Sequence, residues 1–129
     1  MPEVVVAITG ASGARYGVRL VETLIEAGWK IRLIVTGAGA INLDLECQLT
    51  PDDLGEIEGV TLEENDNLAA RSASGSAKID AYVVCPASGT TIGKIAAGIS
   101  DNLATRSALV ALKERRKLIL VPREAPYAT

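Results

Sequence analysis

The sequence has 129 residues, enough for one domain with a useful core but too few for two independent cores. A formal net charge of -3, with no sustained basic face, argues against a general nucleic-acid binder. No apolar stretch approaches the roughly 20 residues of a membrane helix, and no basic leader precedes the first predicted strand, so we expect a soluble, cytoplasmic protein without a membrane partner.

The residue types that are rare or absent narrow the chemistry. The chain has no histidine and only two cysteines, Cys47 and Cys85, so it offers neither a nitrogen-rich metal site nor a disulfide framework. Ser/His and Cys/His nucleophilic pairs are excluded for the same reason. We therefore predict no metal, and we expect proton transfer to depend on carboxylates, Lys, Tyr, hydroxyls or a bound cofactor. Cys85, at the end of a predicted buried strand, is expected to be a packed, unreactive thiol.

Short apolar runs alternate with helical patterns along the chain. In chain order we predict a strand at residues 3–9, a helix at 14–27, a strand at 30–35, a helix at 38–47, a polar stretch from Pro51 with a short strand near Val60, a strand at 81–85 closed by Pro86, helices at 90–97 and 102–115, and a strand at 118–121. With no Phe and one Trp, the core must be aliphatic. The alternation predicts an α/β domain over residues 1–129, with a parallel sheet and helices on both faces.

Candidate ligand-binding residues follow the predicted strands, as expected for a parallel sheet that binds ligands outside its carboxyl ends. They are Gly10 to Gly13, Thr36, Ser88 to Thr91, and Arg123 with Glu124. The glycine loop allows close backbone approach, offers the Ser12 hydroxyl and precedes a helix N-terminus that suits an anion. Because it lacks full G-x-G-x-x-G spacing, and no acidic residue ends the second strand, a mononucleotide is favoured over a dinucleotide.

Each of these features also has a structural interpretation. The glycine loop fits a tight strand-to-helix turn, and the hydroxyls at residues 88–91 fit helix capping, although capping accounts for one hydroxyl more easily than for three. Arg106 and Lys113 are seven residues apart and share a helix face, about 10.5 Å apart along the axis. Two cations so placed either flank an anion or form a solvated face.

Several motifs together resemble the UbiX family of flavin prenyltransferases. They are T-G-A-S-G-A at residues 9–14 with Tyr16, Gly17 and Arg19, S-G-S at 74–76, A-L-K-E-R-R at 111–116 and V-P-R-E-A-P at 121–126. The resemblance implies a flavodoxin-like (Rossmann-like) three-layer fold that binds FMN and assembles into homo-oligomers, as trimers and often dodecamers. It also implies transfer of the dimethylallyl group of dimethylallyl monophosphate to N5 and C6 of reduced FMN, without a metal. The product, prenylated FMN, serves partner decarboxylases of the UbiD type.

The resemblance also assigns roles to individual residues. The FMN contacts fall on a set drawn from four loops: Gly10, Ala11, Ser12, Thr36, Ser88, Gly89, Thr90, Thr91 and Arg123. The active-site carboxylate falls on Glu46, which is expected to handle the proton on flavin N5 together with Ser12. Arg106, Lys113 and Glu124 match residues around the prenyl phosphate. The two cations would stabilise the departing phosphate, and Glu124 would orient them.

The chain departs from the family pattern at three points. Ala87 stands where many relatives have Cys, Leu109 stands where they commonly have Asp, and relatives continue well beyond Thr129 to supply a Tyr and a basic residue to the prenyl-phosphate site. We therefore expect a C-terminally truncated flavoprotein domain. Two alternatives stay open: an FMN-binding protein without transferase activity, and a flavin-dependent decarboxylase of cysteine-containing substrates, an activity that generally uses a histidine.

Overall fold

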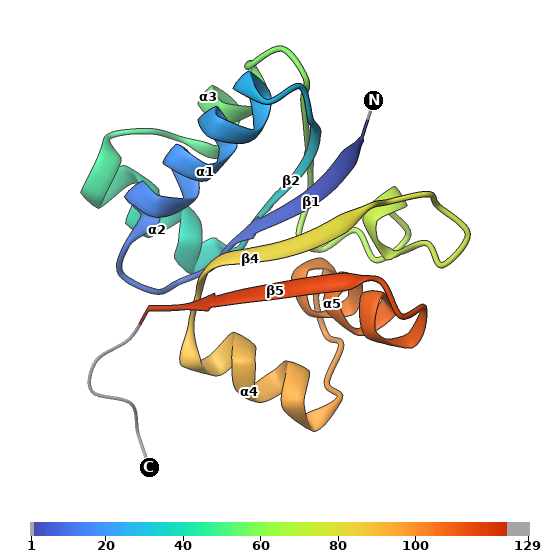
Figure 1. Cartoon of the computed structure of the whole chain (residues 1–129). Coiled ribbons are helices and arrows are strands. Elements are labelled where there is room, and N and C mark those ends of the chain that lie inside the picture. The colour runs from blue at the N-terminus through green and yellow to red at the C-terminus, as the bar shows by residue number, and fades with distance from the viewer. Residues whose placement is uncertain (1, 124–129) are drawn as a thin grey trace.

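The computed structural model describes residues 2–123, which form a five-stranded sheet with helices on both faces (Figure 1). The strands are β1 (Glu3–Ile8), β2 (Lys30–Val35), β3 (Val60–Glu63), β4 (Ala81–Ala87) and β5 (Lys117–Pro122). The helices are α1 (Ala14–Glu26), α2 (Gly37–Cys47), α3 (Pro51–Gly55), α4 (Gly89–Ala97) and α5 (Leu103–Lys113), with a 3-10 turn, η1, at Arg71–Ala73. Glu124, one of the predicted site residues, lies outside the described residues.

The strand order places the expected ligand crevice between β1 and β4. All neighbouring strands are parallel, in the order β3-β2-β1-β4-β5. From β1 the chain adds β2 and β3 on one side, and it then returns to add β4 and β5 on the other. Ligands of such sheets bind outside the carboxyl ends of the two neighbouring strands at which the strand order reverses. The predicted three-layer α/β fold is confirmed, with the strand order of a Rossmann-like sheet.

The predicted strands and main helices are confirmed with small shifts at their ends. The structure adds two short elements that periodicity could not reveal, because α3 has five residues and η1 has three. The prediction that Pro86 closes the fourth strand was wrong, since β4 continues to Ala87. A register shift against β5 between Val84 and Ala87 accommodates the proline, because the missing N–H falls at an irregularity of the ladder.

Successive side chains of β1 enter two different apolar layers, because side chains alternate between the faces of a strand. Val4, Val6 and Ile8 join the core beneath α1, α2 and α3, whereas Val5 and Ala7 join the core beneath α4 and α5. Both layers are built almost wholly from aliphatic side chains, as the composition predicts.

Arg116 ties two of the sequence motifs together. Its guanidinium donates hydrogen bonds to the Tyr82 hydroxyl at 2.8 Å and to the backbone carbonyl oxygens of Ser74 and Gly75 at 3.4 and 2.6 Å. Gly75 lies close to the Glu114 side chain at the end of α5, since a Cβ on Gly75 would lie 2.9 Å from Oε1 of Glu114. The S-G-S and A-L-K-E-R-R motifs therefore have a shared structural role, which is to dock the 74–76 loop onto the turn between α5 and β5.

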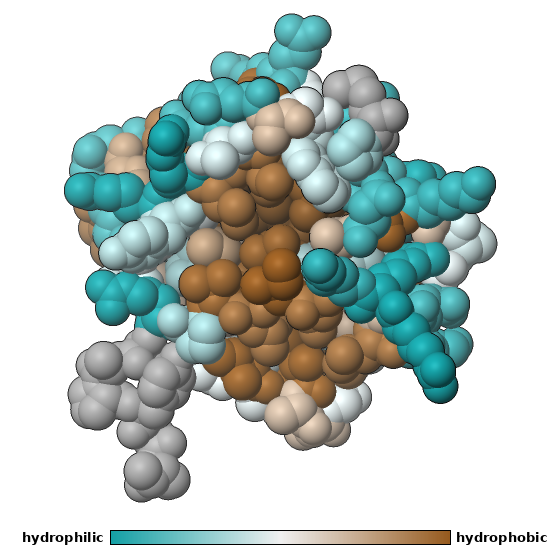
Figure 2. Space-filling view, viewed as in Figure 1, coloured by the Kyte–Doolittle hydropathy of each residue, from teal (hydrophilic) through white to brown (hydrophobic). Residues whose placement is uncertain are grey.

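One apolar face of the sheet is open in the described chain. Figure 2 shows it as a continuous brown area over β4 and β5, beside α1. The groove there has a volume of about 630 Å³, and Ile119 and Val121 in its wall are 44% and 39% exposed. Within residues 2–123, none of the helices is both long enough and apolar enough to cross a bilayer.

Gly17 lets α1 lie directly on the boundary between β1 and β4. A Cβ at this position would lie 2.7 Å from the carbonyl oxygen of Cys85 and 3.0 Å from Cγ1 of Ile8. Separations this short require the backbone or the core to move. The close contact sets the position of α1, and thus of the glycine loop that precedes it.

We predict that Gly17→Ala destabilises the protein, because overpacking costs about 1–3 kcal/mol, more than the gain in helix propensity. Gly93→Ala is the matched control. Gly93 lies inside α4, and a Cβ there meets nothing within 4 Å, so alanine should stabilise by about 0.5–1 kcal/mol. Urea unfolding midpoints should therefore shift in opposite directions. Equal stabilisation by both substitutions would contradict the close packing of α1.

Candidate functional site

The carboxyl ends of β1, β2 and β4 open onto one pocket of about 320 Å³. Its lining comes from the loops after these strands, from α2 and α4, and from the N-cap of α5: Gly10, Thr36, Ala38, Ser88, Thr90, Thr91, Lys94 and Asn102. Five of them come from the predicted FMN-binding set: Gly10, Thr36, Ser88, Thr90 and Thr91. Segments far apart in the sequence thus meet where the strand order reverses.

A buried threonine joins the two central strands at this edge. Thr9 is fully buried, and its Oγ1 donates a hydrogen bond to the carbonyl oxygen of Pro86 at 2.7 Å. The same hydroxyl accepts a hydrogen bond from the backbone N–H of Ser88 at 2.8 Å. Sequence reasoning placed Thr9 in the glycine-loop motif but not among the site residues, because its hydrogen-bond partners lie on a distant strand.

Three helices begin at the pocket, and each is capped by a lining residue. Oγ1 of Thr36, Oγ of Ser88 and Oδ1 of Asn102 each accept a hydrogen bond from an N–H in the first turn of α2, α4 and α5, at 3.0, 3.1 and 2.9 Å. Helix N-termini carry partial positive charge, so three of them at one pocket favour an anion. A capping role for the Thr36 and Ser88 hydroxyls is therefore compatible with a ligand site at the same helix starts.

The glycine loop packs against α2. A Cβ on Gly10 would collide with the Cβ of Ala38, so only glycine allows this approach. The Nδ2 of Asn42 donates a hydrogen bond to the carbonyl oxygen of Ala11 at 3.0 Å and holds the loop on α2. Ser12 is exposed at the tip of the loop.

Glu46 reaches from the last turn of α2 to the start of α1. Its Oε1 accepts hydrogen bonds from the backbone N–H groups of Gly13 and Ala14, at 3.0 and 2.9 Å. The N-cap residue of α1, Gly13, supplies no side-chain cap, so the Glu46 carboxylate serves as one from another helix. The fold thus brings Glu46 beside Ser12, and it reveals a capping role that the sequence did not predict.

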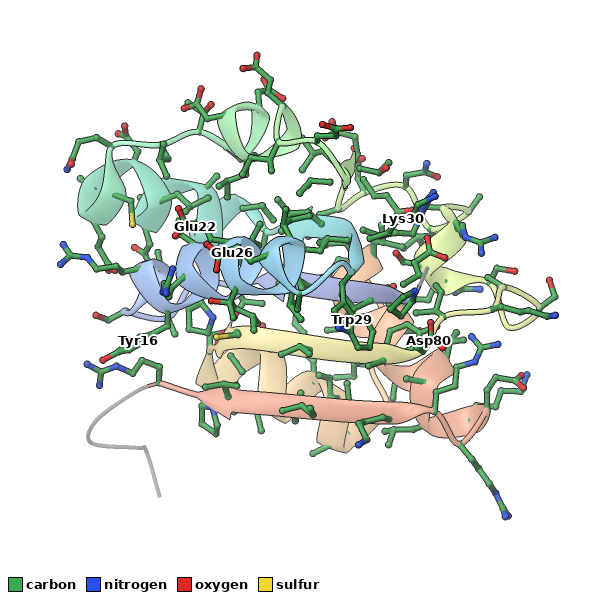
Figure 3. All side chains as sticks on the ribbon, turned by 45° about the horizontal axis from the view of Figure 1, so that its top comes forward. Tyr16, Glu22, Glu26, Trp29, Lys30 and Asp80 are labelled. Atoms are coloured by element: carbon green, nitrogen blue, oxygen red, sulfur yellow. The ribbon has the colours of Figure 1, made fainter. Side chains whose placement is uncertain are left out.

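Arg123 lies on the other side of the same loop. Its guanidinium Cζ is 5.8 Å from the centroid of the Tyr16 ring, a cation–π contact. Figure 3 shows Tyr16 at the end of α1 nearest the carboxyl end of β5. Gly13 has a φ of 101°, and a Cβ there would lie 2.9 Å from Cγ of Arg123 and 3.0 Å from Cδ2 of Tyr16. Backbone conformation and space therefore both require glycine at this position.

Within the described chain, neither Arg106 nor Lys113 lines this pocket. Both are exposed on α5, which runs antiparallel to the strands because it leads into the parallel strand β5. Lys113 ends α5 at the amino edge of the sheet, whereas Arg123 follows the carboxyl end of β5. The six residues of β5 separate the two edges by about 20 Å.

The buried thiol offers no alternative chemistry. Cys85 is 4% exposed within β4, and burial raises the pKa of its thiol, which favours the unreactive neutral form at neutral pH. The expectation of a packed thiol is confirmed. Across residues 2–123, no group of three or more His, Cys, Asp or Glu side chains is placed to hold a metal ion.

Comparisons with known proteins identify the family. The family model described as Flavoprotein matches residues 1–126. The flavin prenyltransferase UbiX of Thermoplasma acidophilum is 44% identical over 126 residues, which are 98% of this chain and 68% of that protein. The chain belongs to the UbiX family of flavoproteins. It spans about two thirds of the length of the curated relatives it matches.

Solved structures of the family share this fold. The structure of AnUbiX (PadA1), crystallised with FMN and dimethylallyl pyrophosphate, superposes with a TM-score of 0.94 at 32% identity, over 98% of this chain and 67% of that one. A dodecameric FMN-dependent UbiX-like decarboxylase from Escherichia coli O157:H7 superposes with a TM-score of 0.93 at 36% identity, over 98% and 69%. The predicted flavodoxin-like flavoprotein fold is therefore confirmed.

We predict that Thr9→Val weakens both the fold and flavin binding. Valine keeps the shape but removes the hydroxyl, so the partly buried N–H of Ser88 loses its acceptor at a cost of about 1–3 kcal/mol. Thr9→Ser keeps the hydroxyl and serves as the control. Urea unfolding and FMN titration of both variants measure the effect. A Thr9→Val protein with wild-type stability and affinity would show that the hydroxyl does not hold the two strands at the site.

Proposed function

We propose that the protein is a flavin prenyltransferase, which joins the dimethylallyl group of dimethylallyl monophosphate to reduced FMN. The observation that carries this proposal is the Glu46 carboxylate, which reaches from α2 to the glycine loop at the edge of the sheet where five of the predicted FMN-binding residues line one pocket. Membership of the UbiX family supports the same reaction.

The pocket suits the phosphate of FMN. Hydroxyl groups from Thr36, Thr90 and Thr91 and three helix N-termini supply donors, and the described lining contains no carboxylate to repel a dianion. Beside the pocket, the glycine loop and Arg123 would hold the rest of the flavin. When bound and reduced, FMN supplies the nucleophilic N5 and C6 atoms of the reaction.

Glu46 and Ser12 are proposed to handle the proton of flavin N5. Two backbone N–H groups, those of Gly13 and Ala14, fix the carboxylate through Oε1. This arrangement orients Oε2 without using it, so Oε2 can accept a proton from a ligand at the loop. The Ser12 hydroxyl, at the exposed tip of the loop, would donate or accept a hydrogen bond at flavin N5.

Arg106 and Lys113 are proposed to stabilise the departing phosphate from a neighbouring copy of the chain. Within one chain Lys113 and Arg123 lie at opposite edges of the sheet, so a site that uses both needs a homo-oligomer, either a trimer or a dodecamer. The dodecamer of the E. coli relative supports such an assembly. Glu124 would orient the cations. The prenylated FMN would pass to a decarboxylase of the UbiD type.

The test is to incubate the protein anaerobically with reduced FMN and dimethylallyl monophosphate and to identify the flavin product by mass spectrometry. Wild type should form the prenylated adduct. Glu46→Gln should retain FMN but lose at least about 100-fold in rate, because general acid–base groups typically contribute 10²–10⁴-fold. Asp44→Asn, an exposed carboxylate on the same helix, should react normally.

Three outcomes separate the possible functions. Bound FMN without any adduct would leave a flavin-binding protein without transferase activity. Normal turnover by Glu46→Gln would remove this carboxylate from the mechanism. Loss of carbon dioxide from a cysteine-containing peptide would instead indicate the decarboxylase, despite the absence of histidine.

A further inference from the structure

The pocket has a charged lining residue that neither the sequence motifs nor the proposed reaction assigns. Lys94 lies on α4, four residues after Thr90, so the two side chains share a helix face and both line the pocket. Lys94 is the only charged side chain among the described residues of this lining. A cation placed among three helix N-termini adds a full positive charge to their partial charges.

The ammonium group of Lys94 is held at the edge of the pocket by a carboxylate. Its Nζ lies 3.0 and 3.2 Å from the two carboxylate oxygens of Asp101, in the loop between α4 and α5. The Asp101 side chain is 54% exposed and that of Lys94 is 31% exposed. Exposed ion pairs contribute little free energy, so this pair can open at low cost.

An acidic cavity lies directly beyond this ion pair. It has a volume of about 510 Å³ and shares Thr36 and Asn102 with the pocket that Lys94 lines. Its other lining residues include Asp52, Glu64 and Asp66, together with Asp101. The Lys94–Asp101 pair therefore lies between a pocket whose only charged lining residue in the described chain is a lysine and a cavity lined by several carboxylates. An anion is favoured on the Lys94 side and repelled on the other.

We infer that Lys94 binds the phosphate monoester of the flavin and that Asp101 holds its ammonium group beside the pocket until the phosphate replaces it. This inference rests on the proposed FMN site. Lys94 then makes the site selective for FMN over riboflavin, which has the same ring system without the phosphate. Asp101 competes with the phosphate for the same cation, so it limits FMN affinity.

Binding of FMN and of riboflavin, measured by flavin fluorescence with the whole protein at two salt concentrations, tests the assignment. Lys94→Gln should weaken FMN binding about 10- to 100-fold, the usual range for a hydrogen bond to a charged group, and should leave riboflavin binding unchanged. It should also reduce the salt dependence of FMN binding. Lys94→Arg should restore most of the preference for FMN.

Two further variants sharpen the result. Asp101→Asn should tighten FMN binding by roughly two- to fivefold, because it removes an exposed competing charge, and should not change riboflavin binding. Lys30→Gln makes the same charge change as Lys94→Gln at the other end of the sheet from Tyr16 (Figure 3), and it should leave both affinities unchanged.

The outcomes distinguish this inference from the proposed function. If wild type binds FMN but Lys94→Gln keeps the wild-type ratio of FMN to riboflavin affinity, the role of Lys94 is overturned and the flavin site stands. Equal weakening of FMN binding and riboflavin binding by Lys94→Gln would likewise overturn the role of Lys94, because the side chain would then act through the fold. Failure of wild type to bind FMN would overturn the proposed function as well.

Discussion

The Thr9 hydroxyl is the interaction on which the site depends. Thr9 and Pro86 are 77 residues apart in the chain, and the Thr9 hydroxyl bonds to the Pro86 carbonyl and the Ser88 N–H at the point where the loops after β1 and β4 diverge. Parallel strands that end together leave their loops free to separate, and the Thr9 hydroxyl prevents this separation together with the Thr9 backbone N–H, which bonds to the same Pro86 carbonyl at 3.2 Å. The glycine loop and the start of α4 therefore face one another at fixed separation, which a rigid anion site requires.

Glycines and caps turn this junction into a binding surface. Gly10, Gly13 and Gly17 allow the loop and α1 to lie against α2, Arg123 and the sheet, at distances that a Cβ would prevent. The Glu46 carboxylate occupies the N-terminus of α1, so the positive ends that remain open to a ligand are those of α2, α4 and α5. One helix start thus orients the proposed acid–base group, while three others favour the phosphate.

Much of this organisation follows from local patterns. The order of strands and helices, the aliphatic core and the loops after the strands were all predicted, because alternation of apolar runs and turn residues acts over short distances. Thr36 and Ser88, two of the predicted FMN contacts, cap α2 and α4 and line the pocket, and their contact with FMN stays a prediction. The extension of β4 past Pro86 was missed, because tolerance of a proline depends on the register of the neighbouring strand.

The amino-acid sequence alone determined the fold class, the family and most of the residues that line the pocket, because glycines, hydroxyls and motif spacing are local features of the chain. Only the tertiary structure decided which groups meet. The bonds of Glu46 to the start of α1, the Thr9 bridge and the meeting of Lys94 with Gly10 and Thr36 at one pocket all join residues distant along the chain. The separation of Lys113 from Arg123 was decided in the same way, because the direction of α5 relative to the sheet is a property of the packed fold.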